Sequence, residues 1–123
     1  MSTHINDIPN AAVIAAAFPP AALTETDAGP TIDLTNADGA CFAVQLVGSV
    51  SSGDTLTGAL EESDDGNTWT AVTGGAFTVA SAVGVQTLRF VRTKRYVRWV
   101  GTVAGTDPEI VAAVLVGEQK KVF

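Results

Sequence analysis

The stretch Ala59-Leu-Glu-Glu-Ser-Asp-Asp-Gly-Asn-Thr-Trp-Thr-Ala-Val72 has the pattern of a β-hairpin. Asp65-Gly66 supplies the turn, because Asp and Gly tolerate positive φ at the central positions of a tight turn. Leu, Thr, Trp and Val alternate with other residues on both sides, as they do in half-buried strands. The stretch therefore predicts two antiparallel strands and favours a fold organised around turns.

The rest of the chain has the same character. Its 123 residues are enough for one domain with one core. Short apolar runs follow one another, separated by Gly, Asp and Asn, which favours an all-β fold. We expect an antiparallel β-sandwich or a jelly-roll-like barrel of about eight strands, with an extended N-terminal arm. The predicted strands span residues 31–35, 40–48, 55–62, 67–72, 76–80, 86–92, 95–104 and 109–117.

Residues 1–30 lack a clear strand pattern and are predicted to form the arm, with residues 31–123 as the β-sandwich domain. A short helix, capped by Asn10 and stopped by Pro19, is one alternative for the arm, and an extended segment is the other. The arm is too apolar for a solvated tail, so we expect it to dock on this domain or on a neighbouring subunit. Its large apolar residues are Ile5, Ile8, Val13, Ile14, Phe18 and Leu23.

Alternation predicts which strand faces point into the core. In the run that follows Cys41, we expect Phe42, Val44 and Leu46 to point inward and Gln45 to point outward. Cys41 is expected to be a small buried hydrophobe without a redox role. The other predicted core residues are Leu56, Leu60, Leu88, Phe90, Val97, Trp99 and Val103.

The last predicted strand breaks the alternation. Residues 110–116 are all apolar, so the strand needs cover on both faces. The arm or another subunit is expected to supply that cover, since an uncovered apolar face invites association. Val111 and Leu115 are therefore candidate interface residues, and a homo-oligomer is expected.

Charge divides the chain into two parts. Residues 1–88 hold ten acids and no base, whereas residues 89–123 hold seven bases and three acids, which leaves a net charge of −6. Such asymmetry predicts either internal pairing or a charged protein partner. An acidic protein repels a phosphate backbone, so nucleic acid is not an expected partner. The candidate contacts are Arg89, Arg92, Arg95 and Arg98, and internal pairing with Glu61, Glu62 or Asp64 is the alternative for each.

Catalytic and metal-binding patterns are weak. His4 is the only histidine and lies in the predicted arm, which disfavours catalytic constellations built on histidine. The acidic residues 61–67 lack the spacing of an EF-hand loop and are expected to be solvated, with ion binding left open. We predict no enzymatic activity, no cofactor and no metal. Apolar runs are too short to span a bilayer, so no membrane partner is expected.

Two resemblances concern the hairpin region. Ser63-Asp-Asp-Gly-Asn-Thr-Trp69 is similar to the Asp-box of sialidase-like propellers but is one residue short and occurs once. A longer resemblance spans residues 31–117. It comprises Ile32-Asp-Leu34, an apolar strand ending in Gly48, the motif at 60–69, Lys94-Arg-Tyr-Val-Arg98 and Val114-Leu-Val-Gly117. This succession resembles small β-sandwich structural proteins of tailed bacteriophage heads.

The second resemblance implies a function. It implies a virion protein of the capsid decoration or cement type, made in the host cytoplasm. Such a protein binds the outer capsid surface and stabilises the shell by bridging major capsid subunits, often as a homotrimer. We expect the arm to supply attachment, with the four candidate arginines as charge-complementary contacts. A head-tail connector or tail component is the first alternative. A carbohydrate-binding module is the second, with Trp69, Tyr96 and Trp99 as stacking platforms.

Overall fold

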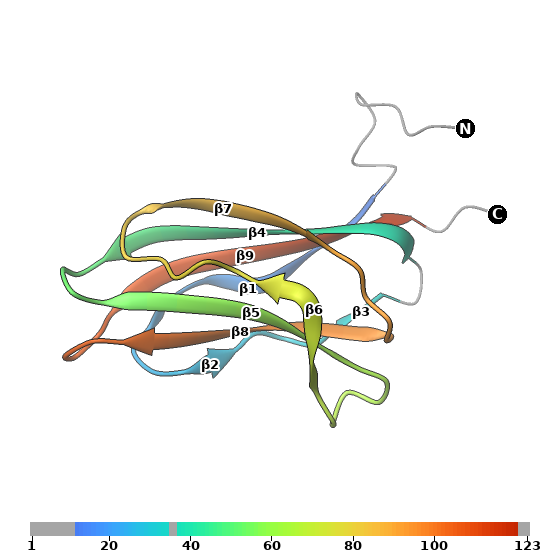
Figure 1. Ribbon diagram of the computed structural model, residues 1–123, viewed down its shortest axis with the longest axis horizontal. Coiled ribbons are helices and arrows are strands. Elements are labelled where there is room, and N and C mark those ends of the chain that lie inside the picture. Colours follow the sequence, from blue (N-terminus) through green and yellow to red (C-terminus); the bar gives the residue numbers. More distant parts are fainter. Residues whose placement is uncertain (1–11, 35–36, 121–123) are drawn as a thin grey trace.

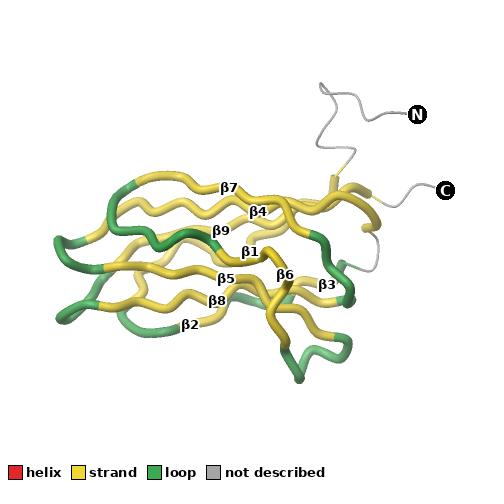
Figure 2. Tube along the Cα trace, viewed as in Figure 1, coloured by secondary structure: helices red, strands yellow, loops and turns green. Residues whose placement is uncertain are grey.

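The computed structural model describes residues 12–34 and 37–120, and it confirms the all-β sandwich. Two antiparallel sheets lie one above the other, and long strands run along the length of the molecule (Figures 1 and 2). None of the described residues belongs to a helix that could cross a membrane. The strands are β1 (Ala12–Leu23), β2 (Asp27–Ala28), β3 (Ile32–Asp33), β4 (Ala37–Val50), β5 (Thr55–Ser63), β6 (Thr70–Ala76), β7 (Gly84–Phe90), β8 (Tyr96–Ala104) and β9 (Ile110–Lys120).

The first sheet has the strand order β1-β9-β4-β7, and the second has the order β2-β8-β5-β6, with β3 also paired to β8. The C-terminal strands are interior strands: β9 in the first sheet and β8 in the second. β9 lies between β1 and β4 and is hydrogen-bonded on both edges. The apolar run at residues 110–116 therefore lies in an interior strand of the first sheet.

The hairpin predicted around Asp65-Gly66 is present as β5 and β6, which pair antiparallel. Its connection is longer than a two-residue turn, because residues 64–69 leave the ladder and only Gly66 among them has a positive φ, of 78°. Asp65 stabilises this loop, since its Oδ1 accepts hydrogen bonds from the backbone N–H groups of Asn67 at 2.8 Å and Thr68 at 3.0 Å. These bonds lower the pKa of Asp65 from 3.8 to about 2.

The core between the sheets is centred on Trp99, which is fully buried. Its ring packs against Phe18 with centroids 4.9 Å apart. Trp99 Nε1 donates a hydrogen bond of 3.1 Å to Gln45 Oε1, which joins the second sheet to the first. Gly58 makes room for this bond, because a Cβ there would overlap the Gln45 amide.

The predicted orientation of β4 is wrong. Cys41 and Gln45 point into the core, whereas Leu46 is 45% exposed on the outer side. Phe42 and Val44 share the outer face with Leu46, because side chains alternate along a strand. A shift of one residue exchanges the two faces of a strand, and both faces of β4 are largely apolar, so alternation alone did not fix its phase. The other predicted core residues point inward, with Leu88 and Val103 only partly buried.

Part of the predicted arm belongs to the sandwich. Residues 12–23 form β1, which pairs with β9 at the edge of the first sheet, so the extended alternative is confirmed there and the helix is not. Phe18 and Leu23 are buried in the core. β1 covers the edge of β9 and not its outer face. Ile5 and Ile8 lie outside the described residues.

Candidate interaction surface

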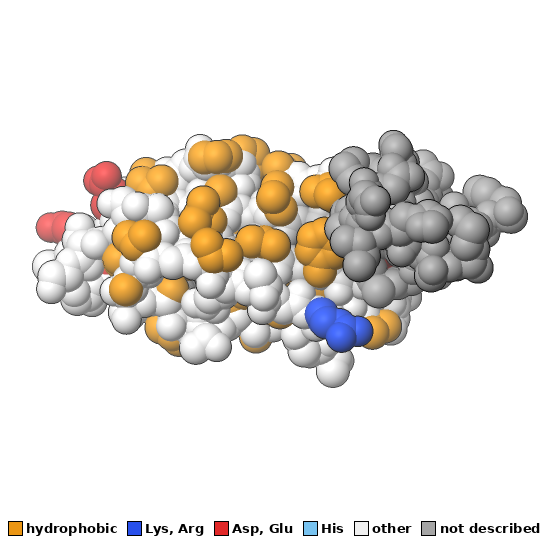
Figure 3. All heavy atoms as spheres, turned by 90° about the horizontal axis from the view of Figure 1, so that it is seen from above, with side chains coloured by type: hydrophobic (Ala, Val, Ile, Leu, Met, Phe, Trp, Pro, Cys, Tyr) orange, Lys and Arg blue, Asp and Glu red, His pale blue; other side chains and the backbone are white. Residues whose placement is uncertain are grey.

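The outer side of the first sheet is a broad apolar surface. We call it the outer apolar face and define it by Ile14, Phe42, Val44, Leu46, Val85, Val111 and Leu115. The face is continuous across the four strands, because Leu115 pairs with Val44 and Leu46 pairs with Val85. Figure 3 looks onto the molecule from this side and shows hydrophobic side chains spread over the middle of the view.

Five of these side chains are strongly exposed: Ile14 at 49%, Leu46 at 45%, Val85 at 62%, Val111 at 36% and Leu115 at 46%. Together they expose on the order of 400 Å² of aliphatic surface, which is within the range of patches that are often functional on monomers. Single exposed apolar residues need no explanation, whereas the largest contiguous patch of a monomer often marks an interaction site. The face is therefore the main candidate for binding another macromolecule.

Gly117 leaves room for the Phe42 ring at one end of the face. It lies on β9 between Ile14 of β1 and Phe42 of β4 in the strand register. A Cβ at this position would overlap the Phe42 ring, so the ring lies across the glycine backbone. This packing covers the glycine and contributes an aromatic surface to the face.

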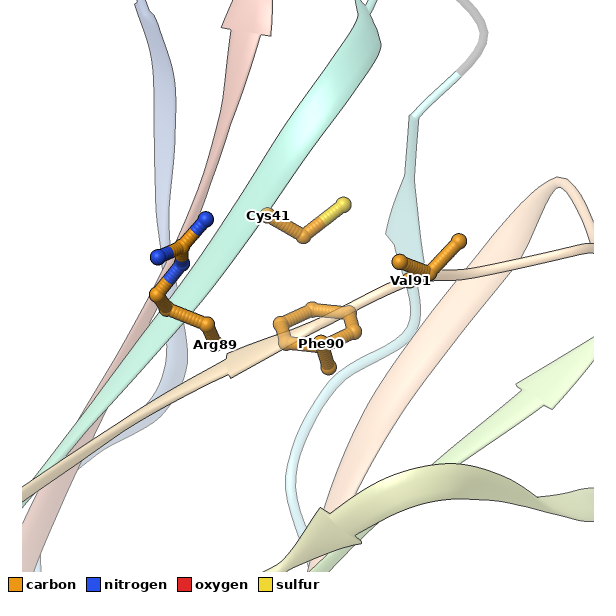
Figure 4. Close-up of a pocket in the computed structure, with 4 residues that line it drawn as sticks. All are labelled: Cys41, Arg89, Phe90 and Val91. Carbon is orange, nitrogen blue, oxygen red and sulfur yellow. The ribbon is translucent and has the colours of Figure 1, made fainter.

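Arg89 is the basic residue of this surface. It pairs with Phe42 in the β4–β7 register and is exposed on the same side. It lines a shallow open depression of about 460 Å³ with Cys41, Phe90 and Val91 (Figure 4). Burial, with the nearby charge of Glu118 as a second cause, raises the pKa of the Cys41 thiol to about 11. The thiol is therefore protonated and unreactive at neutral pH, and it gives the depression no nucleophile.

The other three candidate arginines form internal ion pairs, but only Arg98 does so with one of the three predicted partners. It pairs with Glu61 at 2.7 Å. Arg95 pairs instead with Asp33 at 2.8 Å. Arg98 also lies over the Trp69 ring, 4.5 Å from the ring centroid. Glu61 and Arg98 are directly opposite in the β5–β8 register, which explains why this pair forms.

Arg92 makes the most buried of these pairs, with its Nε 2.5 Å from Glu118 Oε2. It also donates hydrogen bonds of 2.9 Å to the carbonyl oxygens of Lys94 and Leu34. The nearby Glu62 accepts a 2.7 Å hydrogen bond from the Thr93 backbone N–H. These bonds tie the loop between β7 and β8 to both sheets, so Arg92 has a structural role.

The predicted interface residues thus separate into groups. Ile14, Val111, Leu115 and Arg89 lie together on the outer side of the first sheet. Phe18 is a core residue, and Arg92, Arg95 and Arg98 are paired within the chain. Val13 lies opposite Glu118 in the β1–β9 register. The sequence analysis missed Phe42, Val44, Leu46 and Val85, although the apolar character of both faces of residues 40–47 was a usable signal.

The aromatic platforms of the carbohydrate alternative are not free. Trp99 is fully buried, and Arg98 covers the Trp69 ring. Arg95 lies over the Tyr96 ring, 4.9 Å from its centroid. Within the described ranges, no group of three or more His, Cys, Asp and Glu side chains is arranged to hold a metal ion.

The comparisons with known proteins identify no relative: no protein-family model, no curated protein and no solved structure matches this chain.

Proposed function

We propose that this protein is a non-enzymatic structural component of a virion, of the capsid decoration or cement type. In this proposal it binds the outer surface of a capsid and stabilises the shell by bridging major capsid subunits. The observation that supports attachment is the outer apolar face, which spans the whole first sheet. The resemblance of residues 31–117 to phage head proteins supplies the kind of partner.

The face has enough surface for adhesion. At about 25 cal/mol per Å², burying roughly 400 Å² of aliphatic surface contributes about 10 kcal/mol before costs. Association and side-chain ordering cost roughly 4–15 kcal/mol, which is similar to that gain. A capsid surface that buries comparable apolar area of its own would make attachment favourable. Arg89, at the side of the face, suits a capsid carboxylate at the rim of the contact.

The attachment surface differs from the one expected from the sequence alone. Phe18 is in the core and three of the four arginines are paired internally, so we assign attachment to the sheet face. Polar rims add specificity, whereas the apolar centre contributes most of the binding energy. We therefore expect attachment to depend strongly on Leu46 and Leu115 and only modestly on salt.

Cosedimentation with capsids tests this proposal. Shells are assembled from the major capsid protein encoded nearest to this gene and mixed with the full-length protein. We expect saturable binding at hundreds of copies per shell. The double variant Leu46→Ser/Leu115→Ser should bind at least tenfold more weakly, because it removes two of the largest exposed side chains of the face.

The matched control is Val79→Ser, which changes a 54% exposed valine outside the four strands of the first sheet. This control should bind as the wild type does. Absence of wild-type binding contradicts the decoration function, and a few copies per particle favours a connector or tail component. Unchanged binding by the double variant contradicts the assignment of the face.

A further inference from the structure

Among the described residues, negative charge lies away from the outer apolar face, and Arg89 is the charged residue beside it. The chain has a net charge of −6, yet none of the carboxylates whose side chains the structure describes lies on that face. Figure 3 shows acidic side chains at one end of the view and the apolar side chains in the middle. All of the described acids belong to the second sheet, to the connecting loops or to the core. Two copies can therefore approach through this face with the least electrostatic repulsion.

The β1 edge of the first sheet is protected against strand addition. It contains Pro19 and Pro20, which have no backbone N–H, and the β1–β9 register shifts there. At the β7 edge, Gln86 Nε2 donates a 2.9 Å hydrogen bond to the carbonyl of Thr78, but the backbone on both sides of Thr78 pairs with β5 of the second sheet. Extension of the sheet at β1 is therefore disfavoured, which favours association through the face.

The face approaches the size of one side of a dimer interface. Four strands spaced about 4.8 Å apart and roughly 30 Å long give a face of on the order of 600 Å². A stable interface buries about 800 Å² on each partner, a comparable area. The side chains are mostly aliphatic, and sheets with such faces pack about 10 Å apart in sandwiches. A second copy offers a surface of the same shape and the same apolar chemistry.

We propose that a second copy of this chain covers the outer apolar face of the free protein, in a two-fold dimer of stacked first sheets. The contact uses the same patch on both copies, so it closes at two and does not continue to the trimer that the phage resemblance implies. The dimer depends on the face alone and not on the capsid proposal. Dimerisation and capsid attachment through this face exclude each other, so a capsid that binds the face competes with the dimer.

Sedimentation equilibrium of the full-length protein over a range of concentrations tests the dimer. We expect twice the monomer mass of 12.6 kDa at high concentration. Leu115→Lys places a charge near the centre of the face and should weaken dimerisation at least tenfold. Val79→Lys, at a similarly exposed valine outside the first sheet, should leave the dimer intact. Circular dichroism checks that each variant is folded, and Leu46→Lys replaces Leu115→Lys if that variant is not.

Several results would overturn the dimer. These are a wild-type monomer at every concentration, a trimer, or a dimer that Leu115→Lys and Leu46→Lys leave unchanged. A full-length monomer that dimerises only after residues 1–11 are removed would show that the chain's own N-terminal segment covers the face. Raising salt should leave the dimer unchanged or tighten it, because salt screens repulsion between acidic copies. Dissociation by salt would contradict apolar packing.

The two proposals fail separately. A dimer that depends on Leu115 without any capsid binding overturns the proposed function and leaves the dimer standing. Capsid binding by a protein that is monomeric when free overturns the dimer and leaves the proposed function standing.

Discussion

Phe18→Ala decides whether the N-terminal segment is part of the sandwich or an attachment arm. Phe18 is 6% exposed, and its ring lies 4.9 Å from Trp99 between centroids. Truncating a buried Phe to Ala costs about 3–5 kcal/mol, to which the lost aromatic pair contributes about 0.5–1.5 kcal/mol. Domains have unfolding free energies of only about 5–15 kcal/mol, so the variant should lose a large share of its stability.

Urea unfolding followed by tryptophan fluorescence and circular dichroism measures this loss. Every variant is compared at one protein concentration, because dimerisation stabilises the folded state by mass action. Val79→Ala, an exposed truncation, is the control and should change the unfolding free energy by less than about 0.5 kcal/mol. If Phe18→Ala costs less than about 1 kcal/mol at an unchanged denaturant slope, the reasoning that places β1 in the core is refuted.

Three further predictions concern the polar groups of the sandwich. Arg92→Met should lower the unfolding free energy by about 3–5 kcal/mol, because it breaks an ion pair in which the Glu118 side chain is only 2% exposed. Arg95→Met breaks an exposed ion pair and should change the unfolding free energy little. Equal losses of unfolding free energy for the two variants in urea would contradict the prediction that the buried pair contributes more. The pKa of Asp65 is lowered from 3.8 to about 2, so its contribution is complete above about pH 4 and is lost as the pH falls toward 2. Asp65→Asn should flatten the dependence of unfolding free energy on pH in that window, and an unchanged slope would be the opposing result. Cys41, with its pKa raised to about 11, should react with Ellman's reagent at pH 8 only after unfolding, whereas prompt reaction of the folded protein would show that the thiol is accessible.

The sequence was sufficient where a local pattern had one physical solution. Asp65-Gly66 between alternating strands predicted the β5–β6 hairpin, and Leu56, Leu60 and Trp99 alternate with residues that are less buried. Residues 110–116 are apolar throughout, which predicted that β9 is covered on both faces. In the single chain its inner face is buried, whereas Val111 and Leu115 on its outer face are exposed.

The phase of β4 required information from other strands. Its larger apolar residues, Phe42, Val44 and Leu46, look like a core face, but Ala43 and Gln45 occupy the inner side. The bulky Trp99 and Phe18 rings fill the space between the sheets, so small residues and a hydrogen-bonded amide fit opposite them. Alternation shows that every second residue of a strand points to the same side. It does not show which side faces the core, because that depends on how much space the side chains of the opposite sheet leave.

The predictions for residues 12–23 and for the partners of Arg92 and Arg95 were wrong for a related reason, namely that both depend on the order of strands in the sheets. Pro19-Pro20 argues against a strand in general, but an edge strand with an irregular register tolerates it. Arg92 and Arg95 find Glu118 and Asp33, which are distant in sequence and are brought near only by the sheet order. Because these cations are paired internally, the charge asymmetry of the chain does not by itself indicate a charged partner.

A cryo-EM map of assembled particles that carry this protein tests the central claim most directly. The account predicts that β1, β9, β4 and β7 face the shell, with Leu46 and Leu115 in contact with major capsid subunits. A map in which this sheet faces solvent while the second sheet makes the contact would contradict it.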